Sequence, residues 1–164
     1  MTQLSSFLTE LERESVATKK MLAAVPNDRY DWTPHPKSMT IRALITHIAE
    51  LPCWIGMVLH TNELDFATMD YKPTGITDTD QLVKEFEKNY EAARVELANG
   101  DESTLGEPWT LRNGERVYSI DPKSEVIRMS LSQTIHHRAQ LGVFLRLLDV
   151  PIPGSYGPSA DESF

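Results

Sequence analysis

Apolar residues recur at the spacing of an amphipathic helix in four long segments of the chain. The pattern predicts helices over about residues 2–24, 39–60, 79–99 and 122–148. Ser38 is placed to cap the second helix, Thr77 or Asp78 the third, and the pair Asp121-Pro122 is a typical start for the fourth. Pro52 lies inside the second predicted helix, where its ring and its missing N–H are expected to produce a kink.

The segments between these helices carry the signals of loops and turns. Residues 26–37 and 61–75 contain prolines or glycines that favour connectors. Between residues 101 and 120 the helical period is lost, and Asn113-Gly114 indicates either a small hairpin or an extended loop. Residues 153–162 are too rich in Gly and Pro for regular structure. The chain is therefore predicted to be an all-α, up-down four-helix bundle with a long irregular C-terminal tail.

Length and composition narrow the class of protein. With 164 residues, of which 40% are hydrophobic, the chain is expected to form one domain over residues 1–164. The net charge of −8 and the scattering of the 16 Lys and Arg residues argue against nucleic-acid binding. The single cysteine, Cys53, excludes an intramolecular disulfide and fits a reducing cytoplasm. No signal peptide or membrane-spanning run is recognisable, so we expect a cytoplasmic protein without membrane partners.

Polar side chains interrupt the apolar stripe of the last predicted helix. Gln133, His137 and Gln140 share this stripe with Val126, Met129 and Phe144. A buried polar group without a partner costs roughly 1–3 kcal/mol, so three within two turns indicate a cavity, a water cluster or a bound ion.

The second predicted helix also carries a histidine on its apolar face. His47 belongs to the inward stripe, so its imidazole is expected to face the last helix. Neutral imidazole is a common ligand of transition metals. His47, Gln133 and His137 therefore form a candidate metal site with open coordination positions.

Simpler interpretations of the same residues stay open at this point. A single histidine on an apolar face is more often a hydrogen-bonded core residue than a metal ligand. His136 lies about 100° from His137 around a helix, so it is expected at the surface or at an interface. Glu50 is expected either to orient His47 or, more simply, to be solvated, and Cys53 to be a small buried residue. An amide oxygen such as that of Gln133 binds zinc or nickel weakly.

Six short segments carry a recognisable combination of residues: Pro34–Met39, Thr46–Pro52, Trp109–Arg112, His136–Leu141, Leu145–Leu148 and Tyr156–Glu162. Together they closely resemble the DinB family, within the DinB/YfiT-like metalloenzyme superfamily, over nearly the whole chain. The resemblance implies a four-helix bundle, often dimeric, with a divalent metal held by one histidine of the second helix and a His-x-x-x-His pair of the last helix. It also implies thiol chemistry, since the superfamily includes S-transferases that use bacillithiol, mycothiol or glutathione, and a maleylpyruvate isomerase.

Carried over to this sequence, the resemblance places the first ligand at His47 and the last at His137. Gln133 stands where the family pattern has the other histidine, and Ala139 where it usually has glycine. We therefore expect a zinc or nickel site that Gln133 weakens. Two functions follow as alternatives. One is a metal-dependent transferase or hydrolase that activates a low-molecular-weight thiol or water toward a small electrophilic substrate. The other is a degenerate, metal-free bundle that binds small molecules or serves as a homodimeric interaction protein.

Overall fold

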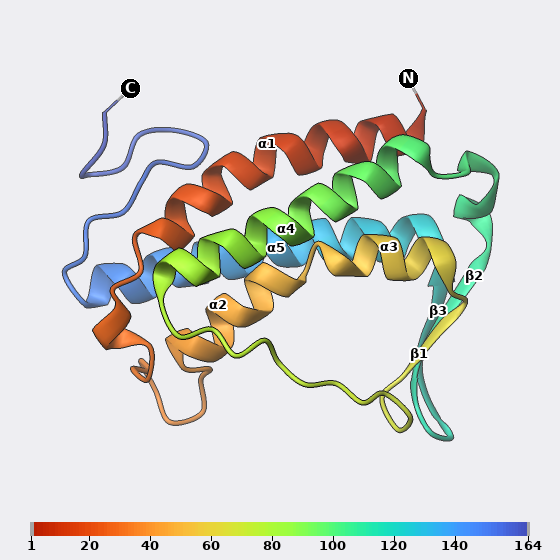
Figure 1. The fold of residues 1–164 in the computed structure, drawn as a ribbon, viewed down its shortest axis with the longest axis horizontal. Coiled ribbons are helices and arrows are strands. Elements are labelled where there is room, and N and C mark those ends of the chain that lie inside the picture. Colours follow the sequence, from red (N-terminus) through yellow and green to blue (C-terminus); the bar gives the residue numbers. More distant parts are fainter. Residues whose placement is uncertain (1, 164) are drawn as a thin grey trace.

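A computed structural model describes residues 2–163, and within them the chain forms five α-helices and a three-stranded sheet (Figure 1). The helices are α1 (Gln3–Ala23), α2 (Ile41–Glu50), α3 (Cys53–His60), α4 (Thr79–Asn99) and α5 (Lys123–Leu147). The strands are β1 (Glu63–Asp65), β2 (Pro108–Asn113) and β3 (Arg116–Pro122). Two short 3-10 helices, η1 (Asn27–Arg29) and η2 (Glu102–Gly106), lie in the connections. The sheet lies at one end of the molecule and the irregular C-terminal tail at the other (Figure 1).

The prediction of an all-α, up-down four-helix bundle is wrong in two respects. The second predicted helix is two helices, α2 and α3, with a bend of 46° at the break. The chain also contains a mixed sheet of order β1-β2-β3, in which β1 is parallel to β2 and β2 is antiparallel to β3. The hairpin at Asn113-Gly114 is formed, whereas β1 falls in a segment expected to be a loop. Three residues are too few to show the alternation by which a strand is recognised.

The break between α2 and α3 is fixed by side chains from two other helices. Pro52 has no N–H to donate, so the helical hydrogen bonds are interrupted there. The carbonyl of Ala49 instead accepts a hydrogen bond from Asn89 Nδ2 of α4 at 2.9 Å. The carbonyl of Leu51 accepts one from Ser130 Oγ of α5 at 2.8 Å. The expected kink is thus a full break whose polar groups are satisfied by α4 and α5.

Helix starts agree only in part with the sequence prediction. Asp78 caps α4 as expected, its Oδ1 accepting from the Gln81 N–H at 2.8 Å. Thr40, rather than Ser38, caps α2 by accepting from the Ala43 N–H at 3.2 Å. Asp121 does not cap α5, because it is paired with Trp109 in the hairpin and Pro122 occupies the N-cap position.

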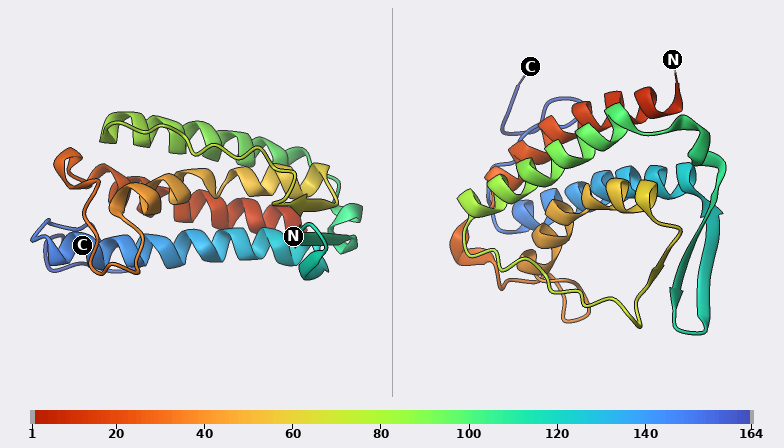
Figure 2. Two further views of the ribbon diagram at one scale, coloured as in Figure 1. Left: turned by 90° about the horizontal axis from the view of Figure 1, so that it is seen from below. Right: turned by 45° about the vertical axis from the view of Figure 1, so that its right-hand side comes forward.

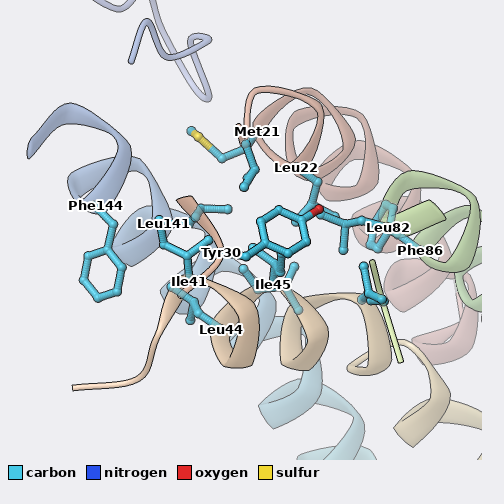
Figure 3. Close-up of a cluster of buried hydrophobic side chains, with 14 of the residues drawn as sticks. Met21, Leu22, Tyr30, Ile41, Leu44, Ile45, Leu82, Phe86, Leu141 and Phe144 are labelled. Carbon is cyan, nitrogen blue, oxygen red and sulfur yellow. The ribbon is translucent and has the colours of Figure 1, made fainter. Parts of the chain in front are cut away.

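Two clusters of buried apolar side chains hold the helices together. The first joins α1, α2, α4 and α5 around Tyr30, and side chains from all four helices converge on it (Figure 3). The second lies nearer the sheet and includes Phe7, Ile55, Trp109 and Ile127. Trp109 is 1% exposed and its Nε1 donates to Thr61 Oγ1 at 3.0 Å, so the hairpin is anchored against the end of α3.

Of the described helices, none taken singly is long and apolar enough to cross a membrane. The bent pair of α2 and α3 reaches that length and hydropathy only when the two are combined.

Candidate functional site

His47 and His137 lie next to each other between α2 and α5. The centroids of their rings are 4.8 Å apart and the ring planes are inclined by 76°. Both side chains are half-buried. Two of the three residues proposed as metal ligands from the sequence are therefore adjacent, although they come from helices 90 positions apart in sequence.

Gln133 lies one helical turn before His137, at i and i+4, so the two residues share one side of α5. Like His137, Gln133 is half-buried. Within residues 2–163 no hydrogen bond joins Gln133 to either histidine. Its participation in a site with His47 and His137 stays a prediction.

The face of α5 that enters the core differs from the stripe predicted from the sequence. The buried positions run through Ile127, Leu131, Thr134, Arg138 and Leu141, whereas Met129, expected inside, is 38% exposed. Arg138 can occupy a core position because its guanidinium pairs with the Glu14 carboxylate at 2.7 Å. Gln133 and His137 consequently lie at the border between core and solvent. A small molecule can reach such a border more easily than the centre of the core.

Gln140 fixes the orientation of the His137 ring. Nδ1 of His137 lies 3.0 Å from Oε1 of Gln140. The amide oxygen can only accept, so Nδ1 carries a proton, and in the neutral ring this leaves the lone pair on Nε2. Metal-binding histidines are commonly oriented by a second hydrogen bond of this kind. The sequence placed Gln140 on the same stripe but gave no sign of this role.

His47 is held in its neutral form. Burial lowers the pKa of its imidazole, and the nearby His137 lowers it further, while the Glu50 carboxylate acts in the opposite direction. No hydrogen bond of the His47 ring is found in the described part of the chain. A neutral imidazole without a partner has a nitrogen lone pair available to a metal or to a proton.

Glu50 fastens the segment between β1 and α4 to α2. Its Oε1 accepts from the Thr74 N–H at 2.9 Å and from Thr74 Oγ1 at 3.0 Å. Its Oε2 accepts from the Tyr71 hydroxyl at 2.6 Å. Burial and the Glu50 carboxylate raise the pKa of Tyr71 to about 12. The simpler sequence expectation, a solvated Glu50, is therefore wrong, and one-dimensional spacing contains no signal for these contacts.

Of the other histidines, only His136 contacts this pair within the described residues. Its ring centroid lies 4.8 Å from that of His137, but the side chain is exposed, as expected from its position on the helix. His60 lies 2.6 Å from Glu96, and His35 Nδ1 accepts from the Lys37 N–H. Cys53 is exposed rather than buried, and desolvation together with Glu50 and Glu85 raises the pKa of its thiol. Cys53 therefore stays protonated near neutral pH and is a poor nucleophile.

The donor set suits a weakly held divalent ion. Across residues 2–163, no group of three or more His, Cys, Asp and Glu side chains is placed to hold a metal. The candidate ligands are thus the imidazoles of His47 and His137 and the amide oxygen of Gln133. Zinc and nickel favour imidazole nitrogen over amide oxygen, so this set fits such a metal less firmly than three histidines would.

The same fold occurs in several solved structures. A DinB-like protein from Bacillus subtilis has a TM-score of 0.71 at 14% sequence identity, covering 92% of this chain and 97% of that chain. A DinB-like protein from Bacillus cereus has a TM-score of 0.65 at 21% identity, and the match covers 95% of this chain and 100% of that chain. A mycothiol-dependent maleylpyruvate isomerase has a TM-score of 0.62 at 17% identity. The match covers 87% of this chain and 63% of the isomerase chain.

These identities establish similarity of fold. A comparison with curated proteins finds no match. The profile of the DinB superfamily matches residues 10–141, a range that includes His47, Gln133 and His137. The chain therefore belongs to the DinB superfamily.

Proposed function

We propose that this protein is an enzyme that acts on small electrophilic molecules beside His47 and His137. The nucleophile is a low-molecular-weight thiol or water, and a divalent metal, zinc or nickel, is held by His47, Gln133 and His137. The observation that carries the proposal is the contact between two half-buried imidazoles from different helices, 4.8 Å apart between ring centroids. One of them is kept neutral by burial, which lowers its pKa.

The protein's own groups have distinct roles in this proposal. The Gln140 oxygen holds the proton of His137 on Nδ1, which leaves Nε2 free to bind a metal or to accept a proton from the thiol. His47 supplies a second neutral nitrogen because its pKa is low. A divalent metal supplies Lewis acidity, which lowers the pKa of the nucleophile. The half-buried setting strengthens each of these electrostatic interactions compared with water.

The similarity to a mycothiol-dependent maleylpyruvate isomerase supports the thiol part of the proposal, since that protein shares the fold. The proposal also includes a cytoplasmic location and a homodimeric assembly, both of which are expectations from the sequence. Light scattering coupled to size-exclusion chromatography measures the assembly directly, and a mass equal to one chain of 18.6 kDa would contradict the homodimer.

A metal-free binding protein is the second candidate function. It is favoured by Gln133, because an amide replaces a strong nitrogen ligand in the donor set. In this alternative the two imidazoles and Gln133 form hydrogen bonds to a bound small molecule instead of to an ion.

Metal content separates the two functions. The protein is purified without a polyhistidine tag, loaded with zinc or nickel, freed of excess metal and analysed for metal per chain. We expect stoichiometric metal in the wild type and in His136→Ala, because His136 is exposed, and none in His137→Ala. Gln133→His is expected to raise the affinity by well over tenfold, more than a typical change around a metal ligand.

The outcomes distinguish the candidates clearly. Metal uptake by Gln133→His but not by the wild type would favour the metal-free alternative. Absence of uptake in both would mean that Gln133 is not directed toward the two histidines. Equal loss of metal in His136→Ala and His137→Ala would contradict the assignment of His137 as the ligand.

A further inference from the structure

A sizeable pocket lies between α2 and the segment that connects β1 to α4. This segment runs from the sheet end of the molecule back to the start of α4 (Figure 2). The pocket has a volume of about 610 Å³, and residues along one side of α2 and residues 71–77 of the segment line it. We call it the α2 pocket. Its volume is within the roughly 300–1,000 Å³ typical of sites for small molecules.

The α2 pocket adjoins the histidine pair along α2. Ala43 lines the pocket and precedes His47 by four residues, so the two side chains are neighbours on one side of the helix. Glu50, one turn after His47, accepts hydrogen bonds from Tyr71 and Thr74, two residues of the connecting segment that line the pocket. His47 does not itself line the α2 pocket, but it lies one helical turn from Ala43, which does.

The charges around the pocket are already compensated. Arg42 is the charged residue among those that line it, and its guanidinium donates to Asp31 and to the carbonyl of Ile76. The same group lies over the Tyr30 ring at 5.1 Å. The nearby Glu50 carboxylate accepts hydrogen bonds from Tyr71 and Thr74. Arg42 is thus already engaged by Asp31 and Ile76, and the other residues that line the pocket are uncharged, so the pocket suits an uncharged molecule.

One hydroxyl in the pocket has no partner. Thr46 is 6% exposed, and its Oγ1 forms no hydrogen bond within residues 2–163. The hydroxyls of Tyr71 and Thr74 are used by Glu50, and that of Thr40 caps α2. In the described part, no fully enclosed side-chain nitrogen or oxygen lacks a partner, so the small exposure of Thr46 must include its hydroxyl. Since Thr46 lines the pocket, this exposure is to the pocket.

We propose that the α2 pocket binds an uncharged, largely apolar small molecule whose carbonyl or hydroxyl oxygen pairs with Thr46. The threonine hydroxyl can donate to a carbonyl or exchange a hydrogen bond with an alcohol. The molecule is the electrophilic substrate of the site, and this last part rests on the proposed function. The binding itself does not require a metal.

Two substitutions test the pocket, one at an exposed position and one that keeps the shape of a buried side chain. Ala43 is exposed to solvent, so Ala43→Leu fills the pocket and leaves the buried side of α2 unchanged. Thr46→Val keeps the shape of the side chain and removes the hydroxyl. Ala92→Leu, at an exposed position of α4, is the matched control for the first substitution. Thermal unfolding verifies that all variants are folded.

The probe is benzylacetone, an uncharged aryl ketone, titrated in nuclear magnetic resonance against methyl signals of Ala43, Thr46 and Ile76 in metal-free protein. We expect these signals to shift, with an affinity lowered at least about tenfold by Ala43→Leu and about fivefold by Thr46→Val, and unchanged by Ala92→Leu. Hydrocinnamate and phenethylamine, its carboxylate and ammonium counterparts, should bind more weakly because the lining is otherwise uncharged and Arg42 is already paired with Asp31.

Absence of binding, equal binding by all variants, or preference for either charged counterpart would overturn the proposal. Zinc uptake is measured in parallel for the wild type and Ala43→Leu. Loss of ketone binding with normal zinc uptake locates the defect in the pocket. Ketone binding in a protein that takes up no zinc retains the pocket and removes the proposed metal chemistry.

Discussion

At the scale of single residues, His137 owes its orientation to Gln140. Their hydrogen bond is local to α5 and keeps the proton on Nδ1. In Gln140→Leu this acceptor is lost, so we expect a mixture of both tautomers and a metal affinity lower by roughly 10–100-fold. The nitrogen chemical shifts of the His137 ring measure the tautomer, and the exposed His136 ring is an internal control. Unaltered His137 shifts in the variant would show that another group orients the ring.

The neutral state of His47 predicts a pH dependence of stability. Its pKa in the folded protein is below the ordinary value of 6.5, mainly because of burial and then because of His137. At pH values well above 6.5, His47 is neutral in both the folded and the unfolded chain and does not affect the free energy of unfolding. As the pH falls below 6.5, the unfolded chain takes up a proton that the folded protein does not, so the free energy of unfolding decreases. The decrease ends at the folded pKa.

His47→Asn removes this contribution. Between pH 6.5 and the lower, folded pKa, we expect the wild type to lose more stability than the variant does. Urea unfolding at a series of pH values measures the difference. If the two proteins show parallel curves, His47 is not buried in a neutral form.

For single residues, the sequence predicted the position of a side chain on its helix better than its hydrogen-bond partners. Helical spacing is a local property, and it was enough to place His47 and His137 on inward-tending sides of their helices. The hydrogen bonds of Glu50 to Tyr71 and Thr74 depend on how a distant segment lies across α2. Such contacts depend on tertiary packing, and the hydrophobic period of a single helix carries no information about it.

At the scale of elements, the break between α2 and α3 depends on Asn89 and Ser130. Each is buried and donates to a carbonyl at the break. Asn89→Leu would leave the buried Ala49 carbonyl without this partner, at a cost of roughly 1–3 kcal/mol. Ser130→Ala removes one of two hydrogen bonds to the Leu51 carbonyl, which still accepts from the Trp54 N–H at 3.1 Å, so we expect a smaller loss of about 1 kcal/mol. Chemical denaturation measures this loss, and Ser132→Ala, at an exposed position of α5, is the control. Equal stability of the two serine variants would mean that the hydrogen bond from the Trp54 N–H is sufficient for the Leu51 carbonyl.

The elements themselves were predictable where their signals are local. Helix periods, the Asp78 cap and the disturbance at Pro52 all follow from short stretches of sequence. The strand β1 does not, because it exists through pairing with β2 in the register Leu64 to Leu111. A sheet that joins segments so far apart changes the fold class, which is why the all-α prediction failed at this point.

At the scale of the whole molecule, one hydrogen-bond network joins the first helix, the last helix and the tail, and it is buried at Arg138 and Glu14 but exposed at Tyr156. Arg138 of α5 pairs with Glu14 of α1 at 2.7 Å and also donates to the Glu14 carbonyl and to Thr18. Its Nη2 donates to the hydroxyl of Tyr156, which in turn donates to Glu14 at 2.9 Å. The sequence pattern gave no sign that Arg138 is buried, because the pattern of one helix does not show a partner on another.

The network predicts a specific order of stabilities. Arg138→Met leaves the Glu14 carboxylate buried without its cation, so we expect a loss of about 3–5 kcal/mol in the free energy of unfolding. Adding Glu14→Leu removes the unpaired carboxylate, and we expect the double variant to recover much of the lost free energy of unfolding. Tyr156→Phe deletes two hydrogen bonds but keeps the ion pair, and we expect it to cost about 2 kcal/mol or less. Urea unfolding of the variants measures this order. A double variant as unstable as Arg138→Met would show that the arginine stabilises the protein through its packing rather than through its charge, because only a charge effect is relieved by removing Glu14.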